Sequence, residues 1–290
     1  EKRFVIGASW VRWWWLIACV HRKLKSQTDR METKDDMHAF IHSPIIRDIF
    51  ICISLLTRLP VQLDERAYEH RSAAGWAFPL VGVVVGTASA LIGILCMILG
   101  FGPNISAGCV VMTSLIITGA MHADGLADCA DGFWGGWTIE RRLAIMKDSH
   151  IGAYGVIALI LIIGLQWQII AALMQAEIAF IALISAAVLS RAPLPLIMVR
   201  IPNARGAGLS HQTAMSDQNA AYGALVLAAI VALIMMGIPG AWVIGCAAGL
   251  AVAATALARW KIGGHTGDTL GATQMLGETF TLLAALQFLA

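Results

Sequence analysis

The sequence predicts an all-α protein, a polytopic bundle of membrane-spanning helices. Of its 290 residues, 58% are hydrophobic and only 13% are charged, whereas soluble domains carry about 25% charged residues. The mean hydropathy is +0.75. The apolar residues also form long runs of about 20 residues, the length that crosses the hydrocarbon core of a bilayer. These observations indicate that the lipid bilayer is a partner of most of the chain.

Seven apolar runs are long enough to span the membrane. They cover residues 76–100, 103–121, 152–174, 177–199, 219–237, 240–258 and 270–290. A shorter run at 45–57 opens with Arg47 and Asp48, so it predicts an interfacial or re-entrant helix rather than a crossing. We therefore expect about seven transmembrane helices after this N-terminal helix, in one membrane-embedded transferase domain over residues 45–290. Residues 1–44 form an N-terminal extension to which the sequence assigns no role.

The loops between these runs indicate the orientation in the membrane. Loops 58–75, 122–151, 200–218 and 259–269 are charged, whereas the turns between the other runs are short and uncharged. The positive-inside rule places all four charged loops on the cytoplasmic side. Polar groups can then converge at one face without crossing hydrocarbon. Topology alone would explain the basic residues of these loops but not the acidic ones.

Charge balance and cysteine usage exclude several classes of function. The net charge of +2 is the balance of 20 basic and 18 acidic residues, so no nucleic-acid partner is indicated. The six cysteines include no C-x-x-C pair, and most lie inside apolar runs. They are typical of small hydrophobic residues rather than of a disulfide framework or a zinc site.

Three aspartates in the second charged loop are the most informative group. Asp124, Asp128 and Asp131 follow one another at i, i+4 and i+7, which places three carboxylates on one face of a helix. Their mutual repulsion favours a bound cation, and Mg²⁺ typically takes one or two carboxylates plus substrate phosphates. His122 is the single imidazole near them, which disfavours zinc. The alternative is a solvated acidic loop.

Basic residues follow the aspartates along the chain. Arg141, Arg142 and Lys147 could bind phosphate oxygens, the arginines bidentately and the lysine as a point charge. An acidic metal cluster followed by basic residues is the composition that phosphoryl transfer needs, because catalysis there is mostly positioning and charge neutralisation. The alternative is that these arginines serve topology alone.

The last charged loop adds two acidic residues. Asp268 lies at a predicted membrane boundary and Glu278 lies deeper in the last span. Ionisable residues inside a membrane are costly and are functional candidates by default. Helix capping is the alternative for Asp268, and a polar partner in the bundle is the alternative for Glu278.

The stretch His122-Ala-Asp-Gly-Leu-Ala-Asp-Cys-Ala-Asp-Gly132, together with Met146-Lys-Asp-Ser149 and Ile151-Gly-Ala-Tyr-Gly155, resembles the signature of the cobalamin synthase family, the adenosylcobinamide-GDP ribazoletransferases. Shorter matches occur at Leu56–Pro60, Phe78–Gly82, Leu189–Arg191, Ala204–Leu209 and Gly264–Ala272, so the resemblance covers about residues 45–290. Two departures are His150, where the family usually has an arginine, and Ala192-Pro193, where a tryptophan is common.

The resemblance implies a Mg²⁺-dependent transferase. A hydroxyl of α-ribazole, or of α-ribazole 5′-phosphate, would attack the cobinamide-linked phosphorus of adenosylcobinamide-GDP and expel GMP, which yields adenosylcobalamin or its 5′-phosphate. The metal ligands would be Asp124, Asp128 and Asp131; the catalytic residues His122, Asp131, Lys147 and Asp148; and the substrate-binding residues Arg58, Arg141, Arg142, Ser149, Arg191 and Asp268. The implied location is the bacterial cytoplasmic (inner) membrane, with other corrinoid-assembly enzymes as partners.

Two other classes of membrane protein compete with this interpretation. A CDP-alcohol phosphotransferase also uses clustered aspartates, but it needs Asp-x-x-Asp-Gly-x-x-Ala-Arg, whereas here Asp124-Gly125 comes first and no Ala-Arg follows at the required distance. A transporter would explain the many spans and the intramembrane ionisable residues. It explains the acidic loop poorly, and the sequence shows no internal repeat.

Overall fold

The computed structural model describes residues 43–61, 63, 68, 73–205 and 217–289. The N-terminal extension predicted for residues 1–44 lies almost entirely outside this range, as do parts of the charged loops 58–75 and 200–218. Contacts divide the chain into residues 1–47 and 48–290. The second part, which holds all the candidate site residues, is described here by itself.

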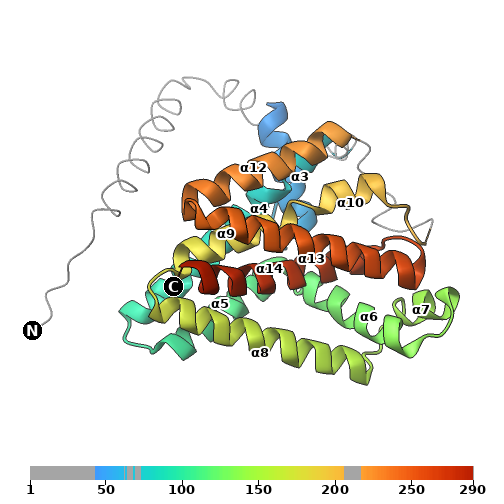
Figure 1. Ribbon diagram of the computed structural model, residues 1–290, viewed down its shortest axis with the longest axis horizontal. Helices are drawn as coiled ribbons and strands as arrows, with labels where there is room; N and C mark the ends of the chain where they lie inside the picture. The colour runs from blue at the N-terminus through green and yellow to red at the C-terminus, as the bar shows by residue number, and fades with distance from the viewer. Residues whose placement is uncertain (1–42, 62, 64–67, 69–72, 206–216, 290) are drawn as a thin grey trace, which may run out of the picture. The chain divides into compact units, whose positions relative to one another are not determined.

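The described residues form helices joined by turns and short loops, and their one β feature is an isolated bridge between Asn203 and His265. The helices, labelled as in Figure 1, are α3 (Pro44–Leu56), the 3₁₀ helix η2 (Ala73–Ala77), α4 (Phe78–Ile98), α5 (Pro103–Thr118), α6 (Met121–Gly135), α7 (Ile139–Ile145), α8 (Ala153–Gln175), α9 (Ala179–Arg191), α10 (Leu194–Arg200), α12 (Gln218–Met236), α13 (Pro239–Ile262) and α14 (Gly267–Leu289). The predicted all-α class is confirmed, and a helix is present where an N-terminal one was expected.

Five helical segments in the described part are long and apolar enough to cross a membrane, which makes the chain a multi-pass helical membrane protein. They are Ala73–Ile98, Ala153–Gln175, Ala179–Arg200, Gln218–Met236 and Pro239–Ile262. The bent pair α5 and α6 would make a sixth. The predicted count of seven is therefore not confirmed.

Two of the seven predicted spans, 103–121 and 270–290, are not among these five, for different physical reasons. The run predicted at 103–121 ends in a bend of 89° between α5 and α6. The run predicted at 270–290 forms α14, which packs against α6, α8, α9 and α13 and lies between α13 and α8 in Figure 1. Because most of the first half of α14 is buried by other helices, that half contains threonine, glycine and glutamine instead of lipid-facing residues.

Close backbone approach holds α4 against α9. A Cβ atom at Gly82 would lie 2.3 Å from the carbonyl oxygen of Ala187, and one at Gly86 would lie 2.8 Å from Cα of Ile184. Small residues at such contacts are typical of helix packing in membranes, where no hydrophobic force draws helices together. These glycines let two spans form the centre of the bundle.

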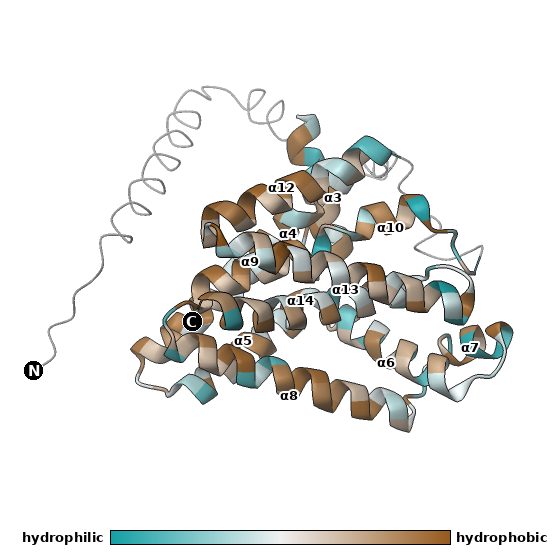
Figure 2. Ribbon diagram, viewed as in Figure 1, coloured by the Kyte–Doolittle hydropathy of each residue, from teal (hydrophilic) through white to brown (hydrophobic). Residues whose placement is uncertain are grey.

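Polar residues gather at one end of the bundle. Figure 2 shows hydrophobic colour along α8 and α12, and hydrophilic colour over α7 and at the ends of α10 and α13. The bend between α5 and α6 directs α6 toward this end (Figure 1). Gly119 (φ 61°) and Ala120 (φ 56°) make the bend, since two successive left-handed residues stop α5 and re-aim the chain.

Candidate active site

The acidic residues of α6 differ in exposure. Asp124 is exposed, Asp128 is half-buried and Asp131 is buried. Charge interactions place Asp128 within reach of Asp124 and also of Asp268, which comes from the first turn of α14. We call Asp124, Asp128 and Asp268 the acidic cluster.

Two glycines bring α14 to the acidic residues of α6. A Cβ atom at Gly125 would lie 2.6 Å from the carbonyl oxygen of Asp268, and one at Gly271 would lie 3.2 Å from that of Met121. The two helices therefore meet backbone to backbone, because any side chain at Gly125 would separate them. This contact places Asp268 beside the carboxylates of α6.

A pair of loops then supplies a cation. The chain after α10 pairs with the chain before α14: Ala204 N–H donates to His265 O, and His265 N–H donates to Pro202 O, each at 2.9 Å. Gly264 is needed there, since a Cβ atom would lie 2.3 Å from Pro202 O. This pairing holds Arg205 so that its Nη2 donates to Asp268 Oδ2 at 2.7 Å.

Asp268 is not the residue that caps α14. Thr266, which precedes the first helical residue, accepts a hydrogen bond from Thr269 N–H at 3.3 Å, and Thr269 Oγ1 accepts one from Thr266 N–H at 2.9 Å. This reciprocal pair satisfies the free N–H groups in the manner of a capping box. The carboxylate of Asp268 is thus left to pair with Arg205.

The acidic cluster is electrostatically strained. Helix α6 lies outside the five candidate spans. Burial, followed by the charges of Asp268 and Asp124, raises the pKa of Asp128 from 3.8 to about 7. A carboxyl group whose pKa is raised by burial and by neighbouring carboxylates is typical of a site that receives a cation or exchanges a proton.

Asp131 has a different environment from the other two aspartates of α6. Its Oδ2 accepts a hydrogen bond from Gly152 N–H at 2.7 Å, and its Oδ1 accepts one from Gly155 N–H at 2.9 Å. A Cβ atom at either glycine would lie 2.4 Å from a carboxylate oxygen of Asp131. Asp131 therefore caps the start of α8 from a neighbouring helix, which satisfies N–H groups that have no partner inside α8.

These positions bear on the expected metal. No group of three or more histidine, cysteine, aspartate or glutamate side chains in the described residues is arranged to hold a metal ion. Mg²⁺ nevertheless commonly uses only one or two carboxylates and completes its shell with water and substrate phosphates. Asp124 and Asp128 fit that requirement, whereas both oxygens of Asp131 are already hydrogen-bonded to backbone N–H groups.

His122 does not face the acidic cluster. It precedes Asp124 by two residues, which turns its side chain to the far side of α6. The side chain is 7% exposed, and burial, followed by the charge of Arg191, lowers its pKa. Its Nε2 has no hydrogen-bond partner among the described residues. The imidazole is therefore directed into the bundle, away from the acidic cluster.

Arg191 belongs to a buried polar cluster between α9 and α14, which we define as Ser190, Arg191, Gln274 and Glu278. Its side chain is 0% exposed, and Nη1 lies 3.3 Å from Glu278 Oε2. Gln274 donates to Ser190 Oγ at 3.2 Å and also to Glu278. Arg191 Nε and Nη2 have no hydrogen-bond partner within the described part of the chain. Arg191, which was predicted to bind substrate, thus lies inside the helix bundle.

Arg142 joins three helices at their ends. Its Nε donates to Gly136 O at 3.0 Å and its Nη1 to Lys261 O at 2.7 Å. Lys261 in turn donates to Phe133 O at 3.0 Å and lies 5.1 Å from the ring centre of Trp134. These contacts close the C-terminal ends of α6 and α13, and they use two of the five N–H donors of Arg142.

The segment after α7 is exposed to solvent. Lys147 and Ser149 in this segment are exposed, and so is Arg141 of α7. His150 Nδ1 lies 2.6 Å from Asp148 Oδ1, and this hydrogen bond lowers the pKa of Asp148 and raises that of His150.

Arg58 lies at the bend before α6. Its backbone N–H donates to Ile117 O at 2.7 Å. Its side chain crosses Gly119, where a Cβ atom would lie 2.5 Å from Arg58 Cγ. The predicted substrate-binding arginine is therefore held at the N-terminal end of α6.

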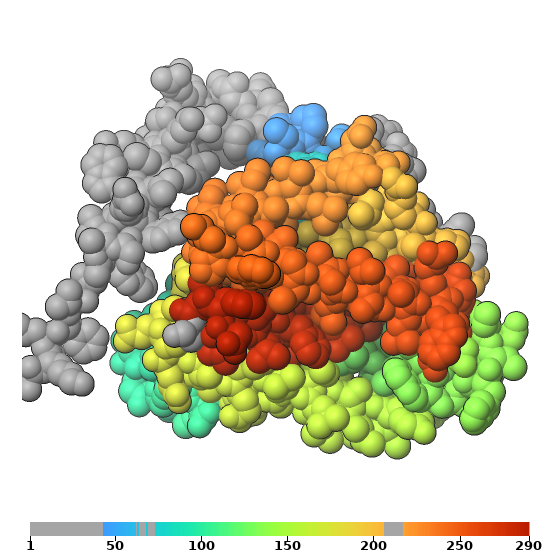
Figure 3. Space-filling model, in the orientation of Figure 1, coloured from blue at the N-terminus to red at the C-terminus, as the bar shows by residue number. Residues whose placement is uncertain are grey.

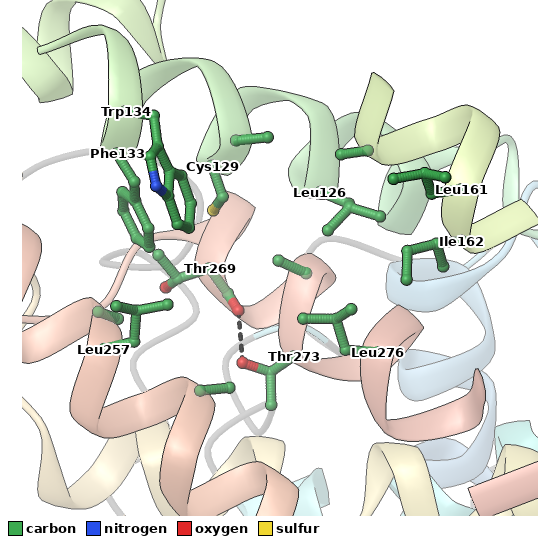
Figure 4. A pocket seen from close by; sticks show the side chains of 15 residues that line it. Leu126, Cys129, Phe133, Trp134, Leu161, Ile162, Leu257, Thr269, Thr273 and Leu276 are labelled. Atoms are coloured by element: carbon green, nitrogen blue, oxygen red, sulfur yellow. Dashed lines mark hydrogen bonds between the residues drawn. The ribbon is translucent and has the colours of Figure 1, made fainter. Parts of the chain in front are cut away.

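An apolar cavity of about 310 Å³ lies on the other side of α6. Figure 4 shows Leu126, Cys129 and Phe133 of α6 directed toward it, opposite Leu257, Thr273 and Leu276. Because these α6 positions fall on the helix side away from Asp124 and Asp128, the cavity is separated from the carboxylates by the helix itself. It supplies no polar group to the acidic cluster.

Two features of this site were not predicted from the sequence. Arg205 lies in a charged loop and in the short match Ala204–Leu209, but no role was assigned to it, although it is the ion-pair partner of Asp268. The contact of Gly125 with α14 was also missed, because glycines in a loop are equally typical of turns. Gly125 directly follows Asp124 and Gly271 lies three residues after Asp268, and this proximity of glycines to two site carboxylates is the signal that was available.

Comparison with known proteins identifies the family. The cobalamin-5-phosphate synthase family matches residues 48–286. An adenosylcobinamide-GDP ribazoletransferase of Bradyrhizobium diazoefficiens is 41% identical over 249 residues, covering 84% of this chain and 95% of the relative. Relatives of the same description from Mesorhizobium japonicum and Rhizobium meliloti are 39% and 40% identical, covering 83% and 81% of this chain and 93% and 94% of theirs.

No solved structure matches the chain. The match to the family covers more than half of the residues and includes α6, the loop after α7 and the start of α14. It favours the resemblance noted in the sequence over both the CDP-alcohol phosphotransferases and the transporters. The chain belongs to the cobalamin-5-phosphate synthase family.

Proposed function

We propose that this protein is a membrane-bound transferase that joins adenosylcobinamide-GDP to α-ribazole or α-ribazole 5′-phosphate. The hydroxyl oxygen of the acceptor forms a bond to the cobinamide-linked phosphorus, and the bond from that phosphorus to GMP breaks. The products are GMP and adenosylcobalamin or its 5′-phosphate. The observation that carries the proposal is the acidic cluster at the polar end of the bundle, in a chain whose relatives carry this description.

Asp124 and Asp128 are the residues proposed to hold Mg²⁺. When bound, the ion would neutralise charge on the diphosphate of the donor, which is the chief requirement of phosphoryl transfer. The raised pKa of Asp128 supports this assignment, because a cation would relieve the repulsion from Asp124 and Asp268. Asp131 is proposed to position α8 and the loop before it rather than to bind the ion.

Arginines and lysines around the cluster are proposed to bind phosphate oxygens. Arg58 is held at the start of α6, while Arg141 and Lys147 are exposed on the loop side. Bidentate arginine contacts would orient the donor, and the lysine would add a point charge. Arg205, already paired with Asp268, offsets part of the charge of that carboxylate.

A carboxylate of the acidic cluster is the proposed proton acceptor for the attacking hydroxyl. The pKa of about 7 for Asp128 applies to the cluster without metal, so a carboxylate that does not bind Mg²⁺ is the one proposed to accept the proton. His122 is less suited, because it is buried on the far side of α6. Catalysis by His122 is therefore not part of the proposal.

The proposed location is the bacterial cytoplasmic membrane, with the polar end facing the cytoplasm. The basic residues of the charged loops support this orientation by the positive-inside rule. Other corrinoid-assembly enzymes are proposed partners at that surface, and co-purification in mild detergent tests them.

Release of GMP by the purified protein tests the proposal. The detergent-solubilised chain is given adenosylcobinamide-GDP and α-ribazole 5′-phosphate, once with Mg²⁺ and once with EDTA. Release that requires both the acceptor and Mg²⁺ is the expected result. If folded protein releases no GMP under either condition, the proposed donor is wrong; if it releases GMP equally in EDTA, the metal assignment is wrong.

A further inference from the structure

A second cavity lies away from the acidic cluster, between α9–α10, α12 and α13. Its volume is about 640 Å³, within the range of about 300–1,000 Å³ that ligand pockets occupy. Figure 3 shows this face hollowed between α12 and α13. We call this cavity the α12–α13 groove. Apolar residues such as Leu189, Leu196, Val226, Ile244 and Val252 form most of its lining.

Two arginines lie at one end of the α12–α13 groove. Arg200 ends α10 and Arg259 lies in the last turn of α13, and both line the groove. Arg200 Nη2 donates to Tyr222 Oη at 2.7 Å, which fixes Arg200 near the start of α12. Because α12 and α13 are joined by a short turn at residues 237–238, the start of α12 and the end of α13 lie at the same end of the bundle.

The apolar part of the groove is accessible from the side that faces lipid. It is walled by α12 and α13, which are both candidate membrane spans. Val226 on α12 and Val252 on α13, which line it, are 59% and 70% exposed. Side chains this apolar and this exposed on a span are typical of contact with hydrocarbon rather than with water. A ligand of this groove would therefore enter from the bilayer.

We infer that the α12–α13 groove binds one anionic phospholipid. An acyl chain lies along the apolar walls, and the phosphate pairs with Arg200 and Arg259. The charges are complementary, since arginine binds phosphate bidentately and basic pockets between membrane helices recognise anionic head groups. A zwitterionic lipid would offer the same acyl chain but would add a cation next to the two arginines.

Labelling with photoactivatable lipids tests this inference independently of catalysis. The full chain is reconstituted into nanodiscs that contain diazirine-bearing phosphatidylglycerol or phosphatidylcholine, and labelled peptides are identified by mass spectrometry. The expected result is labelling of α12 and α13 by phosphatidylglycerol in preference to phosphatidylcholine. Arg200→Gln and Arg259→Gln are each expected to reduce that preference about fivefold. Equal labelling by both lipids would overturn the inference.

A pair of variants on α13 separates the groove from the rest of the lipid-facing surface. Ala248 lines the groove, whereas Ala253 is exposed on the same helix outside it. Ala248→Phe is expected to block labelling, and Ala253→Phe is expected to leave it unchanged. Equal effects of the two variants would show that the label reports the general lipid surface. Protection of the groove by α-ribazole 5′-phosphate would identify it instead as a substrate site and would also overturn the inference.

Discussion

The buried polar cluster and the acidic cluster both contain ionisable side chains, but they differ in how those charges are balanced. In the buried polar cluster, the charge of Arg191 is matched by Glu278. In the acidic cluster, Asp128 faces two further carboxylates, and Arg205 compensates for only part of that charge. An ionisable residue in a membrane bundle is therefore not by itself evidence of a catalytic site. The surplus of one sign of charge distinguishes the catalytic candidate from the structural pair.

The largest expected effect is on stability, in the buried polar cluster. Arg191→Met leaves the charge of Glu278 without its partner, and breaking a buried ion pair costs about 3–5 kcal/mol. The double variant Arg191→Met with Glu278→Gln should recover much of this loss. Equilibrium unfolding in mixed micelles measures both. A stable Arg191→Met protein with a raised KM for the donor would instead return Arg191 to the substrate site.

The next effect is on activity, in the acidic cluster. Asp128→Asn should lower the rate of GMP release by about 10²–10³-fold, the loss typical of removing one preorganised electrostatic contact. Stability should not fall, because the substitution relieves repulsion from Asp268 and Asp124. Glu140→Gln on α7, an exposed acidic residue outside the cluster, is the control and should retain full activity. Activity of Asp128→Asn close to that of the control would contradict the assignment.

Asp131 and Asp124 lie on the same helix, but their substitution should affect different properties of the protein. Asp131→Asn offers one acceptor oxygen to two backbone N–H groups, so it should cost about 1–3 kcal/mol of unfolding free energy. The affinity of the Asp131→Asn variant for Mg²⁺ should stay unchanged. Asp124→Asn, at an exposed position, should show the reverse: normal stability and weaker Mg²⁺ binding, measured by calorimetry. A loss of Mg²⁺ affinity in both variants would make Asp131 a ligand after all.

The last effects concern pH. The pKa of Asp128 is higher in the folded protein, about 7, than its ordinary 3.8, so the unfolded state loses its proton first as pH rises. Without metal, stability should therefore fall between about pH 4 and 7 and then level off. Mg²⁺ affinity should rise over the upper part of that interval, since binding displaces the proton. Thermal unfolding in EDTA and Mg²⁺ titrations at several pH values measure these trends; Asp128→Asn should show neither.

Much of this architecture follows from the sequence because lipid imposes simple rules. Runs of about 20 apolar residues predict helices, and α4, α8, α12 and α13 lie where such runs were found. The prediction was less accurate for α14, since hydropathy does not distinguish a helix in lipid from one surrounded by other helices. It also missed the bend before α6, because a left-handed Ala120 has no strong signature in sequence.

The site was predictable in its residue types but not in its geometry. The spacing of Asp124, Asp128 and Asp131 correctly indicates one helix face, yet it gives no information about Gly152 and Gly155, whose N–H groups bind the third carboxylate. The position of Arg191 was likewise not predictable from the sequence. An arginine at the end of an apolar run is typical of a cytoplasmic boundary, and only the packing of α9 against α14 reveals that it lies inside.

The left-handed pair at residues 119–120 has a consequence for insertions and deletions. These two residues are the entire connection between α5 and α6, so there is no further loop that could rearrange to accommodate an inserted residue. Successive helical residues are about 100° apart around the axis. One residue inserted into α6 between Met121 and Asp124 would therefore turn the carboxylates away from Asp268 and Arg205. Length at this junction is as constrained as the identity of the aspartates.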